Sequence, residues 1–387
     1  MANRNPIRHT LGADGQRGRR IRWSVLTSLC GKLTGIAVQL LAIPVAIRAL
    51  GAERYGVFIT ISAALSWIAM TNLGIGPGLT QGIARAAATG TAQDERRYFV
   101  TACGGTTLFA AIALGALAVM LWAFPLESLL GRQYAPYRLE IGHGIAVLAL
   151  IFAFQILISP VEAARAGYQE QFVTNAWNGG AGILSLLLLF AVAAWWPTIT
   201  AMIVAVYGAA ALVKAPNMYQ LLRGRRYLVP GPVAFDRSVL RVLLSTGLAF
   251  SLVQFSSLLA QQASVFLVGR LLGPGQAAEF GVVFRLVFFA GGIVIMFTQP
   301  LWPAYADAAT RGDKSWIGSA YRKSLLLIAY GAVGGLVLGL FGRQIVHFWV
   351  GRDVMPSASL CAWMGAYLFT SVCSHVHYMT LLGLGQA

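Results

Sequence analysis

The sequence has few charged residues. Only 11% of its 387 residues are Asp, Glu, Lys or Arg, whereas soluble domains carry roughly 25%. Hydrophobic residues make up 57%, and the mean hydropathy is +0.69. Because so few charges cannot cover the surface of a water-soluble globule of this size, the composition excludes a soluble domain. It predicts an integral membrane protein instead.

Cysteine is also scarce, and no pattern for metal, redox or catalytic chemistry is present. The four cysteines lie inside hydrophobic segments, without a CxxC pair or a Cys/His cluster: Cys30, Cys103, Cys361 and Cys373. Such residues are expected to pack as small apolar side chains. The sequence also lacks a GxxxxGK[ST] loop, HExxH, GxSxG and Asp-x-Asp. We therefore predict neither an enzyme nor a protein with a metal or cofactor.

Long hydrophobic segments dominate the chain instead. Each approaches the roughly 20 residues that a membrane-spanning helix needs, whereas the alternating segments typical of outer-membrane barrels do not occur. The fold class predicted is an all-α integral membrane protein. We predict ten spans: Trp23–Ala49, Tyr55–Asn72, Tyr98–Phe124, Ile141–Pro160, Phe172–Trp195, Ile199–Leu222, Val239–Leu267, Phe280–Ala304, Tyr321–Phe341 and Ser357–Leu382.

The net charge of +16 is distributed unevenly between the two sides of these spans. Twenty of the 29 Lys and Arg residues fall on the side of the N-terminal tail, and seven fall on the other. The remaining two, Lys32 and Arg285, lie inside predicted spans. Because basic loops stay in the cytoplasm, we predict a multi-pass protein of the bacterial inner membrane with a cytoplasmic N-terminus. This distribution explains the positive charge without a nucleic-acid partner.

The two halves of the chain resemble each other. Arg48 and Gly51 correspond to Arg270 and Gly273 at a shift of 222 residues, and Gln39 corresponds to Gln261. Six spans precede the loop that joins the halves, and an even number of spans gives both repeats the same orientation. That arrangement is found in two-lobed transporters. We interpret the paired Arg and Gly positions as structural features of the repeat.

The repeat predicts four parts of the chain. Residues 1–22 would form a basic cytoplasmic tail, 23–222 a six-helix bundle, 223–237 a basic cytoplasmic linker and 238–387 a second bundle. The two parallel-repeat bundles are expected to surround a central cavity. The second bundle holds four spans of an expected six. Either two spans are absent or the sequence ends early.

Two local motifs resemble a known family. Residues 48–58 read RALGAERYGVF after Pro44, and residues 71–78 read TNLGIGPG. They are similar to the LG-x-x-x-YG sequence after the first helix, and to the D-L-G-x-G break in the second helix, of the Wzx-type polysaccharide and oligosaccharide flippases. Asn72 stands where that family often has Asp. The superfamily also includes the MATE drug exporters and the lipid II flippases.

This resemblance implies a MATE-like fold of two six-helix bundles around a central cavity. It also implies a substrate, an oligosaccharide repeat unit on undecaprenyl diphosphate, moved to the periplasmic leaflet for O-antigen, capsule or exopolysaccharide biosynthesis. The implied partners are this lipid-linked oligosaccharide, membrane lipids, and the polymerase and chain-length proteins of the same pathway.

Polar residues inside the spans are the candidates for the cavity. The thirteen acidic residues lie in loops or near span ends, so the central ionisable groups are cations, which suits an anionic head group. Lys32 lies about 13 Å into the first span, and Gln39 shares its helix face. Gln254 and Gln261 form the equivalent stripe in the seventh span. We predict that these four residues and Arg285 line the cavity. The alternatives are helix–helix contacts, a Lys32 side chain that reaches to the interface, and an interfacial anchor at Arg285.

Two further pairs of residues have predicted roles. His375 and His377 titrate near neutral pH and are candidates for ion coupling, although their spacing points them to different sides of the helix. Glu162 and Arg165 are spaced for an ion pair at the end of the fourth span.

Two rival functions stay open. A MATE-like multidrug or small-molecule exporter would need a buried carboxylate to bind a cation. A membrane enzyme that acts on lipid-linked sugars would carry a long periplasmic loop, whereas the longest here is Pro125–Glu140.

Overall fold

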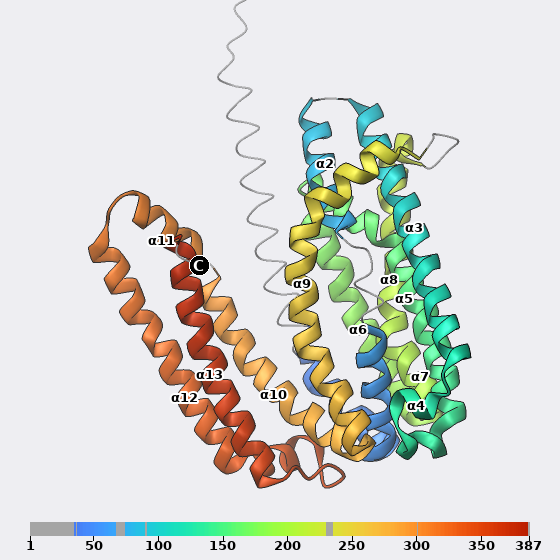
Figure 1. Ribbon diagram of the computed structural model, residues 1–387, viewed down its shortest axis with the longest axis vertical. Coiled ribbons are helices and arrows are strands. Elements are labelled where there is room, and N and C mark those ends of the chain that lie inside the picture. The colour runs from blue at the N-terminus through green and yellow to red at the C-terminus, as the bar shows by residue number, and fades with distance from the viewer. Residues whose placement is uncertain are drawn as a thin grey trace, which may run out of the picture. The chain divides into compact units, whose positions relative to one another are not determined.

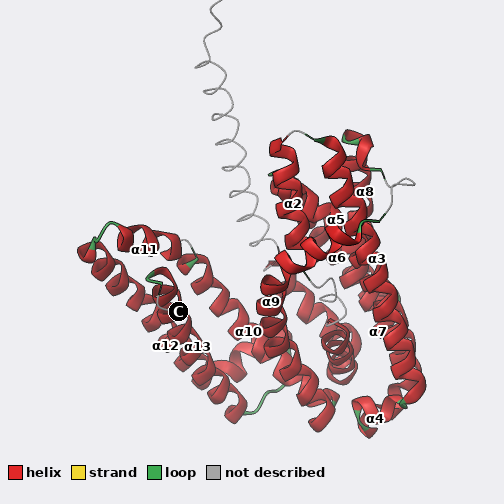
Figure 2. Cartoon of the chain, turned by 45° about the horizontal axis from the view of Figure 1, so that its top comes forward, coloured by secondary structure: helices red, strands yellow, loops and turns green. Residues whose placement is uncertain are grey.

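The computed structural model describes residues 35, 37–66, 74–89, 91–229, 235–299 and 301–385, and these are almost entirely helical (Figures 1 and 2). No strand occurs among them. The all-α class is therefore confirmed. Contacts divide the chain into two units, one formed by Met1–Leu50 and Val57–Pro274 and the other by Gly51–Gly56 and Gly275–Ala387. Lys32 and Asn72 lie outside the described residues.

The first unit contains most of the helices. The helical residues 37–66 come first. They are followed by α2 (Ile75–Thr89), α3 (Ala92–Ala123), α4 (Leu126–Leu130), η1 (Arg132–Tyr137), α5 (Arg138–Gly167), α6 (Gln171–Trp195), α7 (Ile199–Ile203), the π-helical η2 (Val204–Gly208), α8 (Ala209–Gly224), η3 (Arg226–Leu228) and α9 (Arg237–Leu272).

The second unit is smaller and contains α10 (Pro274–Thr298), α11 (Leu301–Thr310), α12 (Lys314–Val350) and α13 (Ala358–Gly383). Helices α12 and α13 meet along small residues. A side chain at Gly365 would overlap the backbone of Gly335, and one at Gly331 would press on Val372. Close contact of backbones through glycine is a common way for membrane helices to associate.

Eight of the ten predicted spans correspond to helices of the structure, and the first two lie partly outside the described residues. Among the described residues, six helical stretches are long and apolar enough to cross a membrane: Ala92–Ala123, Arg132–Gly167, Gln171–Trp195, Ile199–Gly224, Pro274–Thr310 and Lys314–Val350. Each contains most or all of one predicted span. Helices α9 and α13 coincide with two more. The helices generally begin earlier than hydropathy indicates, because their first turns are polar.

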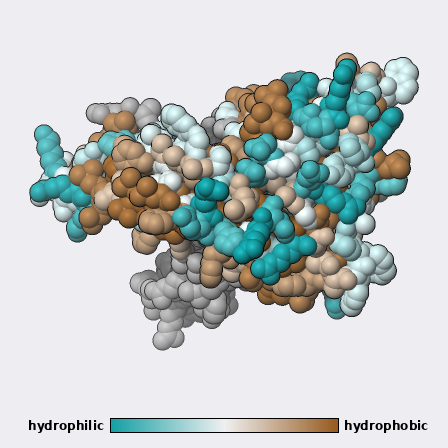
Figure 3. Space-filling model, turned by 90° about the horizontal axis from the view of Figure 1, so that it is seen from below, coloured by the Kyte–Doolittle hydropathy of each residue, from teal (hydrophilic) through white to brown (hydrophobic). Residues whose placement is uncertain are grey.

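The apolar surface of these helices is not buried inside the protein. Along α3, for example, Ile112, Val119 and Trp122 are 55%, 63% and 89% exposed. Helix α5 has the most buried span of the six. In the space-filling view of Figure 3, hydrophobic side chains lie on the surface beside hydrophilic ones. A helix with an apolar exposed side requires an apolar solvent, so these surfaces face lipid.

A hydrophobic cluster holds one end of the first unit together. It joins Ile75, Leu79 and Ile83 of α2 to Phe99 of α3, and it includes buried residues of α5, α8, η3 and α9. Because these helices come from distant parts of the sequence, the cluster fixes the positions of their ends. The polar groups described below are attached to this frame.

Helices α2 and α9 cross in direct backbone contact. A Cβ atom built on Gly247 would overlap the carbonyl oxygen of Gly74, and one built on Gly78 would overlap that of Leu243. Gly74 also has a φ of +87°, which favours glycine. Because of this crossing, α9 belongs to the first of the two units. The sequence repeat instead assigns residues 238–387, which include most of α9, to the second bundle. The four-part division remains a prediction.

The paired glycines of the repeat both have a positive φ. Gly51 has a φ of +76° and Gly273 a φ of +102°, a region that is open to glycine and strained for other residues. Gly273 caps α9, and its N–H donates to the Gly269 carbonyl at 3.0 Å. Gly51, in contrast, lies within the helical residues 37–66. The equivalence of the two bundles as a whole stays a prediction.

Candidate functional site

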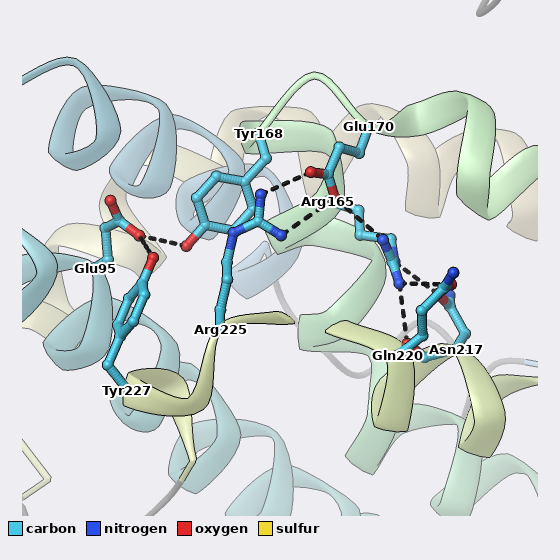
Figure 4. Close-up of polar contacts among 8 residues, drawn as sticks. All are labelled: Glu95, Arg165, Tyr168, Glu170, Asn217, Gln220, Arg225 and Tyr227. Atoms are coloured by element: carbon cyan, nitrogen blue, oxygen red, sulfur yellow. Dashed lines mark hydrogen bonds and ion pairs between the residues drawn. The ribbon is translucent and has the colours of Figure 1, made fainter. Parts of the chain in front are cut away.

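The polar groups of the first unit gather where α3 and α9 begin and α5 and α8 end (Figure 4). The predicted topology makes this the cytoplasmic end. Two groups of side chains lie here, one centred on Arg165 and one on Arg97. Their chemistry differs. Every cation of the first group has an anionic or amide partner. Among the described residues, the second group contains cations that form no ion pair with a carboxylate.

Arg165 of α5 is a buried cation with a full set of acceptors. Its Nε donates to Asn217 Oδ1 at 2.6 Å, and its Nη2 donates to the Asn217 carbonyl and to Gln220 Oε1. Its Nη1 donates to Glu170 Oε2 at 3.1 Å. The side chain is only 4% exposed. A buried charge is tolerated when it is paired and hydrogen-bonded, so this guanidinium joins α5 to α8.

Glu170 extends the network to the loop after α8. Arg225 donates to Glu170 Oε1 at 2.6 Å, and its guanidinium lies 3.8 Å from the centre of the Tyr168 ring. The Tyr168 and Tyr227 hydroxyls both donate to Glu95 of α3. Burial, and then the hydrogen bond to Glu95, raise the pKa of Tyr168. Figure 4 shows these side chains as one connected set, which is suited to holding helix ends together.

This network corrects one pairing predicted from the sequence. Arg165 pairs with Glu170, and Glu162 lies 3.4 Å from Lys214 Nζ on α8. The predicted Glu162–Arg165 pair is therefore wrong. Helical spacing permits that pair, but α8 offers each side chain a partner from another helix, and sequence spacing cannot show such a partner.

The second group connects the first turns of α3 and α9. Arg97 Nη2 donates to Asp236 Oδ2. Asp236 Oδ1 accepts from the Ser238 hydroxyl and from the backbone N–H groups of Ser238 and Val239, which caps α9. The hydrogen bond from the Ser238 hydroxyl, followed by that from Arg97, lowers the pKa of the Asp236 carboxyl.

The residues predicted to line the cavity are placed only in part. Lys32 lies outside the described residues, and the same holds for the side chain of Gln254, although its backbone belongs to α9. Gln39 and Gln261 are both exposed. Arg285 is half-buried near the middle of α10, because this helix begins at Pro274 and not at Phe280. The candidate membrane span continues from Pro274 to Thr310, and Arg285 is nearer its first end, so the predicted location early in the span stays a prediction.

The two candidate coupling residues contact different helices. His375 Nε2 lies 2.9 Å from Thr298 Oγ1 of α10. His377 Nε2 lies 3.1 Å from the Tyr321 hydroxyl of α12, and its Nδ1 lies 2.7 Å from the Cys373 carbonyl. Within the described part of the chain, no group of three or more His, Cys, Asp or Glu side chains could hold a metal ion. Ion coupling by either imidazole stays a prediction.

The Arg residues of the repeat have different surroundings. Arg270 Nη1 donates to the Leu129 carbonyl at 2.6 Å, and Gln133 Nε2 donates to the Arg270 carbonyl at 2.7 Å. These contacts join the end of α9 to α4 and η1. They agree with a structural function for Arg270. Arg48 is exposed.

Comparison with known proteins gives consistent results. Residues 22–308 match the model of a family described as "Polysaccharide biosynthesis protein". A Salmonella typhi protein named "Putative O-antigen transporter" is 24% identical over 327 residues, which is 83% of this chain and 71% of that protein.

Solved structures of transporters have the same fold. An inward-facing multidrug resistance MATE family transporter of the MOP superfamily has a TM-score of 0.71 at 14% identity, covering 91% of this chain and 81% of its own. A MOP superfamily transporter from Pyrococcus furiosus, described as having a binding pocket of reversed polarity, has a TM-score of 0.57 at 15% identity, covering 94% of this chain and 82% of its own. At these identities the likeness establishes a MATE-like fold.

Proposed function

The chain belongs to the family of polysaccharide biosynthesis proteins, and from this premise we propose that it is a flippase for a lipid-linked oligosaccharide. The proposed substrate is a sugar repeat unit on undecaprenyl diphosphate. The protein would carry the head group from the cytoplasmic to the periplasmic leaflet of the inner membrane. No covalent bond changes in this step, so the protein would act as a transporter and not as an enzyme.

The observation that carries this proposal is the sign of the charge inside the helices. Arg285 lies near the middle of α10. In the described helices, the acidic side chains lie within two turns of a helix end, except for Glu53, which lies within the helical residues 37–66. A charged side chain near the middle of a membrane is costly, so such residues are found where a transport pathway or a water-filled cavity stabilises them. A cation at this depth suits a diphosphate or an acidic sugar.

Five residues are proposed to line the path of the head group: Lys32, Gln39, Gln254, Gln261 and Arg285. The glutamines would hydrogen-bond sugar hydroxyls, and the two cations would replace part of the water that solvates the phosphates. His375 and His377 remain the candidates for coupling to an ion. The polymerase and chain-length proteins of the pathway are the proposed partners after translocation.

A MATE-like exporter is the second candidate, because MATE transporters have the same fold. Such a protein would bind cationic compounds, for which a mid-membrane carboxylate is the expected ligand. The relative named as an O-antigen transporter favours the flippase.

Complementation tests the proposed function. The full chain would be expressed in a strain that lacks its oligosaccharide flippase, and surface polymer would be measured beside resistance to cationic dyes. We expect polymer at the surface and unchanged dye resistance. Dye resistance without surface polymer would favour the exporter.

A further inference from the structure

A basic pocket lies at the end of the first unit where α3 and α9 begin. Its volume is about 570 Å³. Helix α3 contributes Gln93, Arg96 and Arg97 to its wall, and the start of α9 contributes Asp236 and Arg237. Phe235, which is 40% exposed, adds an apolar surface. Three guanidinium groups and one carboxylate therefore line a single pocket.

The positive charge of this pocket is only partly neutralised. Asp236 is occupied by Arg97 and by the first turn of α9. Asp94 also lies near Arg97, at 3.9 Å. Among the described residues, neither Arg96 nor Arg237 forms an ion pair with a carboxylate. The Arg96 Nε–H is buried without a hydrogen-bond acceptor, and an unsatisfied buried donor of a charged group is unfavourable.

The backbone adds to the positive electrostatic potential of the pocket. Helix α3 begins at Ala92 and α9 at Arg237, so the positive ends of two helix dipoles meet at the pocket. The Thr91 side chain does not cap α3, so the N–H groups of its first turn are not satisfied by that side chain. Proteins bind phosphate with arginine side chains and with the free N–H groups of a helix N-terminus, and of the two helices only α3 lacks a side-chain cap, because Asp236 caps α9.

The pocket lies at the depth of lipid head groups. Helix α3 has 32 residues and is therefore about 48 Å long, longer than the roughly 30 Å of the hydrocarbon layer. Its polar first turn thus extends beyond the hydrocarbon. Phosphates of anionic lipids occupy this layer, and free phosphates reach it from the water.

We propose that the pocket binds a phosphate group, with Arg96 and Arg237 as its principal ligands and Gln93 as a further donor. Arg97 holds α3 and α9 together through Asp236 and thereby keeps the two ligands in place. The phosphate could be the head group of an anionic lipid or a free phosphate compound, because the same donors recognise both. The proposal depends on the membrane location of the helices and not on the transported substrate.

Binding by the purified full chain in an uncharged detergent tests this proposal. Calorimetric titrations would use dihexanoyl phosphatidylglycerol for the lipid source and inorganic pyrophosphate for the free source. The double variant Arg96→Gln/Arg237→Gln removes both ligands. Arg241→Gln, an exposed cation one turn further along α9 and outside the pocket, is the matched control. Because loss of two charge-assisted hydrogen bonds is expected, binding by the double variant should weaken at least about tenfold.

Each outcome supports or rejects the site. Arginine-dependent binding of phosphatidylglycerol alone identifies a lipid site, and arginine-dependent binding of pyrophosphate identifies a site for free phosphates. Arg96→Lys/Arg237→Lys should retain part of the affinity, which separates lost charge from lost folding. An equal loss in Arg241→Gln, or no loss in the double variant, would overturn the proposal. Neither result bears on the flippase function, because transport is not measured.

Discussion

At the scale of single residues, arginine has contrasting roles in this chain. Arg165 is buried and donates to four acceptors. Arg270 donates to a backbone carbonyl at the end of α4, and Arg96 has a buried N–H without an acceptor. The sequence shows all three only as arginines near helix ends. Arg165 and Arg270 find partners in helices that are distant in sequence, and Arg96 does not, so hydropathy and spacing could not distinguish the three.

Loss of the Arg165 guanidinium should destabilise the protein strongly. Arg165→Met leaves Glu170, Asn217 and Gln220 without their buried partner, and breaking a buried pair typically costs about 3–5 kcal/mol. The measurement is thermal unfolding of the purified chain in detergent. Arg311→Met is the matched control, because that exposed pair with Asp307 should contribute at most about 1 kcal/mol. Equal melting temperatures for the two variants would show that the network does not stabilise the fold.

Removal of the Lys32 charge should reduce transport. The sequence places this cation about 13 Å into the first span, without an acid of the same span within helical contact distance, so the substrate or a hydrated cavity is expected to stabilise it. We expect less surface polymer from Lys32→Ala in a flippase-deficient strain, and partial activity from Lys32→Arg. Immunoblots control for protein level. Full polymer export by Lys32→Glu at normal expression would assign the charge to packing or topology.

At the scale of helices, hydrophobic length was the reliable signal. Predicted spans such as 172–195 and 199–222 agree closely with the helical stretches 171–195 and 199–224. The polar first turns of α3, α10 and α12 were missed because hydropathy does not register them. Helix α10, for example, begins at Pro274, before the predicted start at Phe280.

The packing of the helices could not be predicted from the sequence. The motif at residues 71–78 predicted a break and lies partly outside the described residues; within it, Gly74 has a φ of +87° directly before α2 begins. Its partner Gly247 could not be inferred, because a single glycine in a hydrophobic segment has many possible explanations. The contact of α2 with α9 depends on the approach of two backbones.

The crossing of α2 and α9 should not tolerate a side chain. Gly247→Val places carbon atoms where the Gly74 carbonyl lies, so the helices must separate. We expect a lower melting temperature and reduced surface polymer in the complemented strain. Gly180→Ala, at a helical position with open space around its Cβ, is the control and should be neutral or slightly stabilising. A Gly247→Val protein as stable as the control would contradict the described contact.

At the scale of the whole molecule, the charge distribution predicts topology. Arg226, in the loop after α8, belongs to the basic side, and Ser128 of α4 lies at the opposite ends of these helices; both residues are exposed. In a chain without its native cysteines, Ser128→Cys should react with an impermeant thiol reagent in intact spheroplasts. Arg226→Cys should react only after permeabilisation. The reverse labelling would overturn the predicted orientation.

The central claim is that this chain moves a lipid-linked oligosaccharide across the bilayer. The direct test places the purified full chain in liposomes that contain undecaprenyl diphosphate with a labelled oligosaccharide, and follows digestion of the sugar by an impermeant glycosidase added outside. We expect the substrate of the inner leaflet to become digestible over time. Digestion that stops at the outer-leaflet pool, as in liposomes without protein, would contradict the proposed function.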